Sequence, residues 1–136
     1  NFIFVILDFF MFFNFKKTGK HINYSNYLGG GDWNIPRTYA DVTNTGFKSY
    51  LDSACNAYKL NFENFLPKIK IPVLLIHGDK DTIFPIEQSK EMNRMIKNSK
   101  LIIFRGADHI IPINHSKHLS SEIEKFVTRV YSSSFG

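Results

Sequence analysis

An acid and a base stand near the C-terminal end of the sequence, each after an apolar run. Asp81 closes the segment Ile-Pro-Val-Leu-Leu-Ile-His-Gly-Asp-Lys-Asp at residues 71–81, and His109 closes Gly-Ala-Asp-His at residues 106–109. A histidine works best as a general base when a carboxylate bonds to its far ring nitrogen, because that bond fixes the tautomer and stabilises the imidazolium. The pair predicts acid–base chemistry in which Asp81 orients His109.

The apolar runs before these two residues predict buried strands at 73–76 and 101–104. A helix is expected to open at Pro85 between them, and a last amphipathic helix is expected over 119–130. The order strand, helix, strand, helix predicts a parallel sheet covered by helices. Ligands in such sheets bind at the carboxyl ends of the strands, which is where Asp81 and His109 are expected.

Neighbouring polar residues are expected to have structural roles. Asp79 is interpreted as a loop or helix-capping residue, His77 as packing beneath the site, and Asp108 as supporting the turn before the histidine. Glycines 78 and 106 are expected to let the chain turn tightly after each strand. His115 and His118 have helical spacing, but no third ligand has a recognisable spacing, so no metal site and no cofactor is expected.

The N-terminal half has weaker patterns. The run at 2–7 predicts a strand buried on both faces, residues 14–38 predict a long irregular connection, and apolar positions from Phe47 to Tyr58 predict a helix. Gly29-Gly30-Gly31 is not a phosphate-binding loop, since no Gly-Lys-Ser/Thr follows.

Composition is that of a folded globular chain. The 136 residues are 43% hydrophobic and 21% charged, with a net charge of +5 that is interpreted as a solvated basic surface. No Arg-rich helix or zinc-finger spacing occurs, so no nucleic-acid partner is expected. The apolar N-terminal run is too short to span a membrane, and a single cysteine, Cys55, fits a reducing compartment such as the cytoplasm.

Residues 66–81, with Pro85 after them, resemble the acid-bearing segment of the α/β-hydrolase superfamily, and residues 106–109 resemble its catalytic-histidine segment. This resemblance implies that Asp81 is the acid and His109 the base of a catalytic triad. The superfamily places its nucleophile before both, on a Gly-x-Ser-x-Gly elbow. No such elbow occurs in the 136 residues, and neither Ser25 nor Ser53 matches it.

The fold class implied is therefore α/β, as the C-terminal part of an α/β-hydrolase fold with parallel strands, flanking helices and an inserted helical cap. Residues 1–13 would be a core strand segment after the missing elbow, residues 14–65 the cap or lid, and residues 66–136 the C-terminal core with acid and histidine. Several cap aromatics are candidates for lining an apolar substrate pocket, although packing of the cap on the core is the preferred interpretation for most of them: Trp33, Tyr39, Phe47 and Tyr50.

The resemblance implies a parent enzyme that hydrolyses a small apolar ester or related acyl substrate, and a chain that is inactive without its nucleophile. One alternative is a non-catalytic binding module with the same fold. Another is a receiver-type signalling domain, since Asp8 follows an apolar run, but the later motifs argue against it. The unpaired edge of the sheet is expected to promote self-association.

Overall fold

The computed structural model of the chain describes residues 21–59 and 62–135. The strand predicted at residues 2–7 lies outside this part of the chain. The described residues form two compact units: residues 21–27 and 33–59 belong to one, here called the helical unit, and residues 28–32 and 62–135 belong to the other, here called the core unit. The domain boundaries predicted at residues 13 and 65 stay predictions.

The core unit contains a pair of parallel strands joined by a helix. Strand β1 (Val73–Gly78) pairs with β2 (Ser99–Phe104) in a register that runs from Val73 opposite Ser99 to Gly78 opposite Phe104. Helix α4 (Ile86–Met95) makes the crossover and contacts both strands. The predicted order of strand, helix, strand and helix is confirmed, and each strand is two residues longer than its apolar run suggested.

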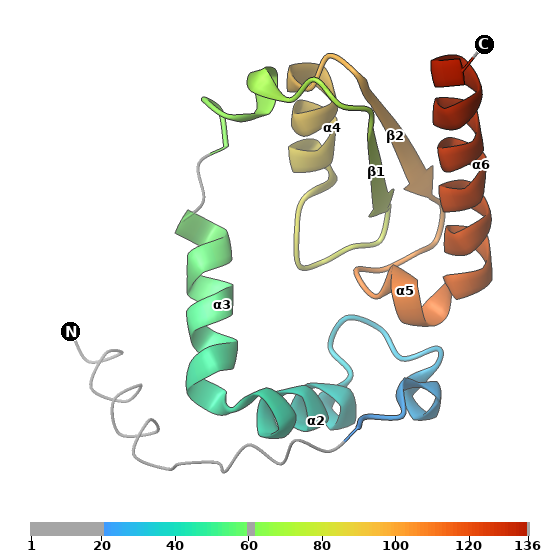
Figure 1. The fold of residues 1–136 in the computed structure, drawn as a ribbon. Coiled ribbons are helices and arrows are strands. Elements are labelled where there is room, and N and C mark those ends of the chain that lie inside the picture. Colours follow the sequence, from blue (N-terminus) through green and yellow to red (C-terminus); the bar gives the residue numbers. More distant parts are fainter. Residues whose placement is uncertain (1–20, 60–61, 136) are drawn as a thin grey trace. The chain divides into compact units, whose positions relative to one another are not determined.

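Helices flank these strands (Figure 1). A short helix η2 (Leu66–Lys68) precedes β1, and α5 (Ile111–Asn114) and the long α6 (Ser116–Phe135) follow β2. The buried cluster consists of Phe104, Ala107 and Ile111, with Leu119 of α6 packed against it. Burial of this apolar surface fixes the start of α6 against the end of β2, just after the predicted histidine segment.

The helical unit contains η1 (Tyr24–Tyr27), α2 (Ile35–Thr45) and α3 (Phe47–Lys59). Helix α3 was predicted, but the prediction of irregular structure through residue 38 is wrong from residue 35 onward. The Asn34 side chain caps α2 by accepting a hydrogen bond from the Arg37 amide at 2.9 Å, and Pro36 lies in the first turn, where its missing N–H costs nothing. The polar composition of the segment had concealed these start signals.

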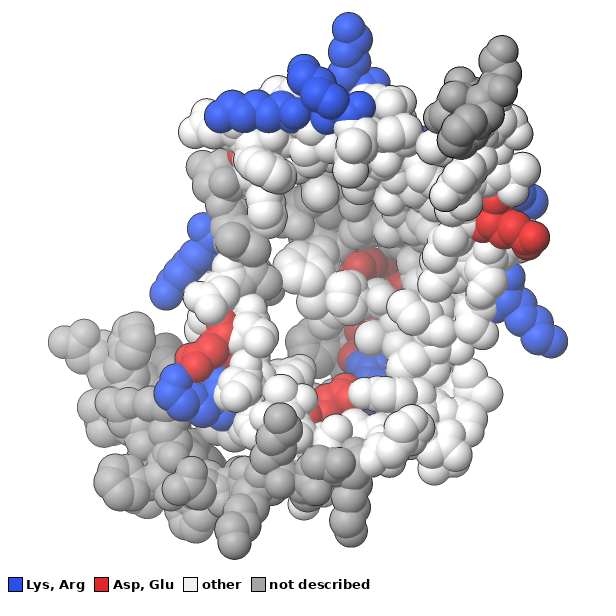
Figure 2. All heavy atoms as spheres, in the orientation of Figure 1, with Lys and Arg blue, Asp and Glu red and all other residues white. Residues whose placement is uncertain are grey.

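Basic side chains gather at the end of the core unit where β1 and β2 begin, away from the carboxyl ends of the strands (Figure 2). These surface lysine and arginine side chains contribute to the net charge of +5 that the whole sequence carries. Within residues 21–59 and 62–135, no helix is both long enough and apolar enough to cross a membrane.

Candidate functional site

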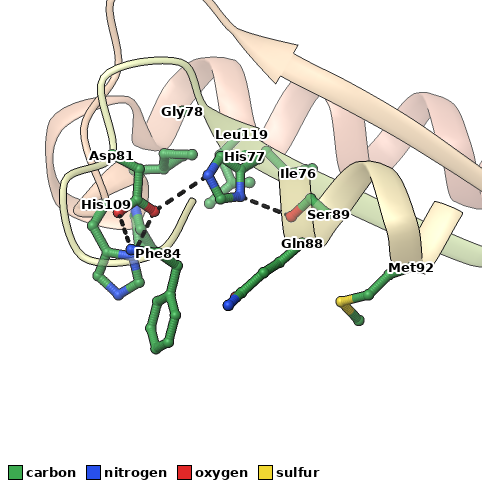
Figure 3. Close-up of a pocket in the computed structure, with 12 residues that line it drawn as sticks. Ile76, His77, Gly78, Asp81, Phe84, Gln88, Ser89, Met92, His109 and Leu119 are labelled. Atoms are coloured by element: carbon green, nitrogen blue, oxygen red, sulfur yellow. Dashed lines mark hydrogen bonds and ion pairs between the residues drawn. The ribbon is translucent and has the colours of Figure 1, made fainter. Parts of the chain in front are cut away.

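A cavity of about 480 Å³ opens at the carboxyl ends of the strands, within the core unit (Figure 3). Both residues of the predicted pair line it. The remaining lining is largely apolar and comes from β1, the loop after it, α4, α5 and the start of α6: Ile76, His77, Gly78, Phe84, Gln88, Ser89, Met92, Ile111, Pro112 and Leu119.

Asp81 is held by the loop that follows β1. Its Oδ1 accepts hydrogen bonds from the amides of Ile83 at 2.8 Å and Phe84 at 2.9 Å, and its side chain is 5% exposed. Burial raises the pKa of the carboxyl, but the hydrogen bonds from Phe84, the His109 ring and Ile83 outweigh it and hold the pKa below its ordinary value. Asp81 is therefore an ionised acceptor.

His109 lies opposite Asp81, with its Nδ1 2.8 Å from Asp81 Oδ2. Because an ionised carboxylate can only accept, Nδ1 carries the proton and Nε2 carries the lone pair. The ring contacts Phe84 at a centroid separation of 5.4 Å, and its side chain is 40% exposed. The arrangement presents an oriented imidazole whose Nε2 can take up a proton.

His77 is a second imidazole on the other side of Asp81 (Figure 3). Its Nδ1 lies 2.8 Å from the Ser89 hydroxyl, and its Nε2 lies 3.6 Å from Asp81 Oδ2, beyond hydrogen-bond distance. The residue is buried, and Nε2 has no hydrogen-bond partner among the described residues. His77 was predicted to pack beneath the site, and in the structure it is a buried residue that also lines the cavity. Its proximity to Asp81 was not foreseen.

The two loops that carry the pair touch each other at Gly78. A Cβ at this position would collide with the backbone carbonyls of Ala107 and Asp108, so the site requires glycine for close approach of the loops. A turn does follow Gly78, because the Asp81 amide donates to the Gly78 carbonyl at 3.2 Å. Gly78 itself does not have a positive φ, whereas Gly106 has a φ of 73°. Asp79 also joins the loops, because its Oδ1 accepts from the Gly106 amide at 2.6 Å.

Asp108 supports a turn, as expected, but this turn contains the histidine instead of preceding it. Its Oδ1 accepts from the Ile110 amide at 2.9 Å, and Asn114 Nδ2 donates to its Oδ2 at 3.1 Å.

Sequence reasoning missed a further carboxylate, Asp32, which accepts hydrogen bonds from Thr82 and from the His109 amide. No periodic pattern marks it, although an aspartate directly after three glycines was a visible signal.

The aromatic cap candidates belong to the helical unit. Trp33 and Tyr39 line an apolar hollow of about 490 Å³ along α2, and they are 74% and 65% exposed. Phe47 and Tyr50 do not line this hollow. A role for any of the four in substrate binding stays a prediction.

The described part of the chain shows no cluster of side chains that suits a metal ion. No group of three or more His, Cys, Asp or Glu side chains there is arranged to hold a metal ion. Cys55 is exposed on α3.

The chain is similar in sequence and in fold to proteins of one family. The family model of the alpha/beta hydrolase fold matches residues 8–116. The bifunctional esterase/perhydrolase DCH of Acinetobacter calcoaceticus is 31% identical over 83 residues, which cover 60% of this chain and 30% of that protein. A pimeloyl-[acyl-carrier protein] methyl ester esterase of Neisseria meningitidis is 31% identical over 97 residues, covering 71% of this chain and 31% of that protein.

Among solved structures, the esterase RhEst1 of Rhodococcus sp. ECU1013 superimposes with a TM-score of 0.52 over 79% of this chain and 40% of that one. The two sequences are 19% identical, so this similarity is evidence for the fold alone. The chain spans about a third of the length of the curated relatives it matches. The family match extends over most of the sequence, and the parallel strands with flanking helices agree with it. The chain belongs to the α/β-hydrolase family.

Proposed function

We propose that this chain is the C-terminal part of an enzyme that hydrolyses an ester of a small, apolar acyl group. Asp81 orients the imidazole, and His109 is the general base. The nucleophile is a serine contributed by sequence upstream of residue 1 in a longer protein. Esterases among the relatives support the reaction class, and the largely apolar lining of the cavity supports an apolar substrate.

The observation that carries this proposal is the 2.8 Å contact between Asp81 Oδ2 and His109 Nδ1. Asp81 is buried, ionised and fixed by two backbone amides, so it selects one tautomer of His109. An ion pair on the surface would need neither a buried carboxylate nor hydrogen bonds from backbone amides to that carboxylate. They are the features expected of a carboxylate that holds a general base ready to accept a proton at Nε2.

The reaction then follows with all protons accounted for. The nucleophile's hydroxyl proton moves to His109 Nε2 as its oxygen attacks the ester carbonyl carbon, and Asp81 stabilises the imidazolium that forms. His109 returns the proton to the departing alcohol when the ester bond breaks. Water then gives a proton to the same nitrogen, attacks the acyl-enzyme, and releases the carboxylic acid as the nucleophile is reprotonated.

The test uses the protein encoded at full length, with p-nitrophenyl acetate and butyrate as substrates. We expect His109→Gln to reduce kcat by a factor on the order of 10⁶, the cost of removing a triad histidine in a serine hydrolase. His21→Gln is the matched control, since His21 is exposed and belongs to the helical unit. Retained turnover in His109→Gln would refute the proposal.

The coding sequence upstream of residue 1 separates this proposal from a non-catalytic binding module. A Gly-x-Ser-x-Gly about one strand–helix unit before Phe2 supports the enzyme. A full-length protein without a nucleophile motif, and without ester turnover, would support the binding module instead. We expect the 136-residue chain on its own to be inactive.

A further inference from the structure

The segment Leu28–Asp32 packs with the core unit, although both segments that flank it belong to the helical unit. Asn114, at the end of α5, holds its backbone at two points. Asn114 Oδ1 accepts from the Gly29 amide at 2.9 Å, and Asn114 Nδ2 donates to the Gly30 carbonyl at 3.0 Å. Gly29 has a φ of 73°, a conformation that favours glycine. These contacts hold the glycine run in place, and Asp32, which follows the run, therefore lies beside the loops that carry Asp81 and His109.

The Asp32 carboxylate bonds to both of these loops. Its Oδ2 accepts from the Thr82 amide and from the Thr82 hydroxyl, each at 2.7 Å. Its Oδ1 accepts from the His109 amide at 2.7 Å. Asp32 is 7% exposed, so water competes weakly for these donors, and hydrogen bonds to a buried carboxylate are among the strong ones.

These hydrogen bonds are made to His109 and to the residue next to Asp81, the two proposed catalytic residues. Thr82 follows Asp81 in the chain, and the amide that Asp32 Oδ1 holds is that of His109 itself. One rigid carboxylate thus sets the distance between the two backbone segments from which the Asp81 and His109 side chains project. Displacement of either segment by about 1 Å would break a hydrogen bond of the kind that joins the two side chains.

We propose that Asp32 is a positioning residue, which keeps Asp81 and His109 within hydrogen-bond distance of each other. Its consequence for turnover rests on the proposed function, but its effect on the Asp81–His109 contact does not. Both oxygens of Asp32 face donors, and an asparagine would turn an NH₂ group toward one of them. Asp32→Asn therefore keeps the size of the side chain and loses part of its function.

The direct readout is the Nδ1 proton of His109, observed by NMR of the ¹⁵N-labelled full-length protein and assigned by its loss in His109→Gln. In the wild-type protein this proton should resonate at low field and exchange slowly with water, because Asp81 accepts it. In Asp32→Asn we expect exchange to accelerate at least about tenfold, the factor that corresponds to the loss of one ordinary hydrogen bond. Asp52→Asn removes the same charge from an exposed position on α3 and should leave the signal unchanged.

Two further variants keep the inference falsifiable if Asp32→Asn fails to fold. Thr82→Val removes the hydroxyl donor alone and should give an exchange rate between those of wild type and Asp32→Asn, whereas Thr82→Ser should restore the wild-type rate. An unchanged Nδ1 proton in a folded Asp32→Asn protein would overturn the inference. If that variant is unfolded, an unchanged signal in Thr82→Val would overturn it.

Turnover of p-nitrophenyl butyrate separates this inference from the proposed function. A positioning role predicts that Asp32→Asn lowers kcat and leaves KM within a few-fold, because the acyl group does not bind at Asp32. If His109→Gln retains turnover while Asp32→Asn still loses the slow Nδ1 proton, the catalytic proposal fails and the positioning inference stands. If the proton signal persists in Asp32→Asn, the positioning inference fails whatever the rates are.

Discussion

Replacement of Asp81 by asparagine should invert the tautomer of His109. Two backbone amides, those of Ile83 and Phe84, point at Asp81 Oδ1. In Asp81→Asn the amide oxygen must take that position, because an NH₂ group cannot accept from them. The NH₂ group then lies where Oδ2 stood and donates to His109 Nδ1. The ring is forced to carry its proton on Nε2, the nitrogen that accepts a proton in the proposed mechanism.

The magnitude follows from this geometry. The equivalent asparagine substitution in a serine-protease triad leaves the geometry intact and lowers kcat by about 10⁴. That factor corresponds to about 5.4 kcal/mol of transition-state stabilisation at 1.36 kcal/mol per tenfold change. We expect a similar loss in kcat for p-nitrophenyl butyrate hydrolysis by the full-length protein. KM should change little, because Asp81 is 5% exposed and its Oδ2 faces His109.

Asp52→Asn provides the matched control, since it removes the same charge from an exposed residue of the helical unit. ¹⁵N spectra of the His109 ring should show the change of tautomer directly. A wild-type rate in Asp81→Asn would refute the role of Asp81, and a lowered rate with an unchanged His109 tautomer would refute the mechanism of the loss.

Other substitutions and conditions test the same site. Gly78→Ala should destabilise the protein by about 1–3 kcal/mol in urea unfolding, because its Cβ would collide with the Ala107 carbonyl; Gly31→Ala, whose Cβ would meet nothing within 4 Å, should not. The backbone hydrogen bonds and the His109 ring hold the pKa of Asp81 below its ordinary value in the folded protein. Its contribution to stability is therefore complete above the unfolded-state pKa and is lost as the pH falls through the folded-state pKa. Unfolding measured at several pH values below about 4 should show this loss in the wild-type protein and not in Asp81→Asn. The isolated 136-residue chain should self-associate through an edge of its sheet, and sedimentation that shows monomer at every concentration would contradict this.

The fold of the core unit could be predicted because its signals are local. The apolar runs before Asp81 and His109 predicted β1 and β2, Pro85 predicted the start of α4, and the spacing of apolar residues predicted α6. The same kind of spacing predicted α3 in the helical unit. Helix α2 was missed because the cap that starts it, Asn34 followed by Pro36, lies in a polar segment without a long apolar stripe. A helix cap can be recognised in a sequence only from one or two residues, and residues of the same types are also common in loops.

The sequence by itself determined the order of the two strands and of helices α4 and α6, and it indicated the two side chains most suited to acid–base chemistry. Chain order, periodicity and residue type need no knowledge of distant contacts. Only the tertiary structure decided what surrounds them. Asp32 reaches Thr82 across 50 residues and His109 across 77, and Gly78 is required by the backbone of a loop that begins more than twenty residues later. Such contacts depend on where folding brings the loops together, and no repeating pattern in the chain records them.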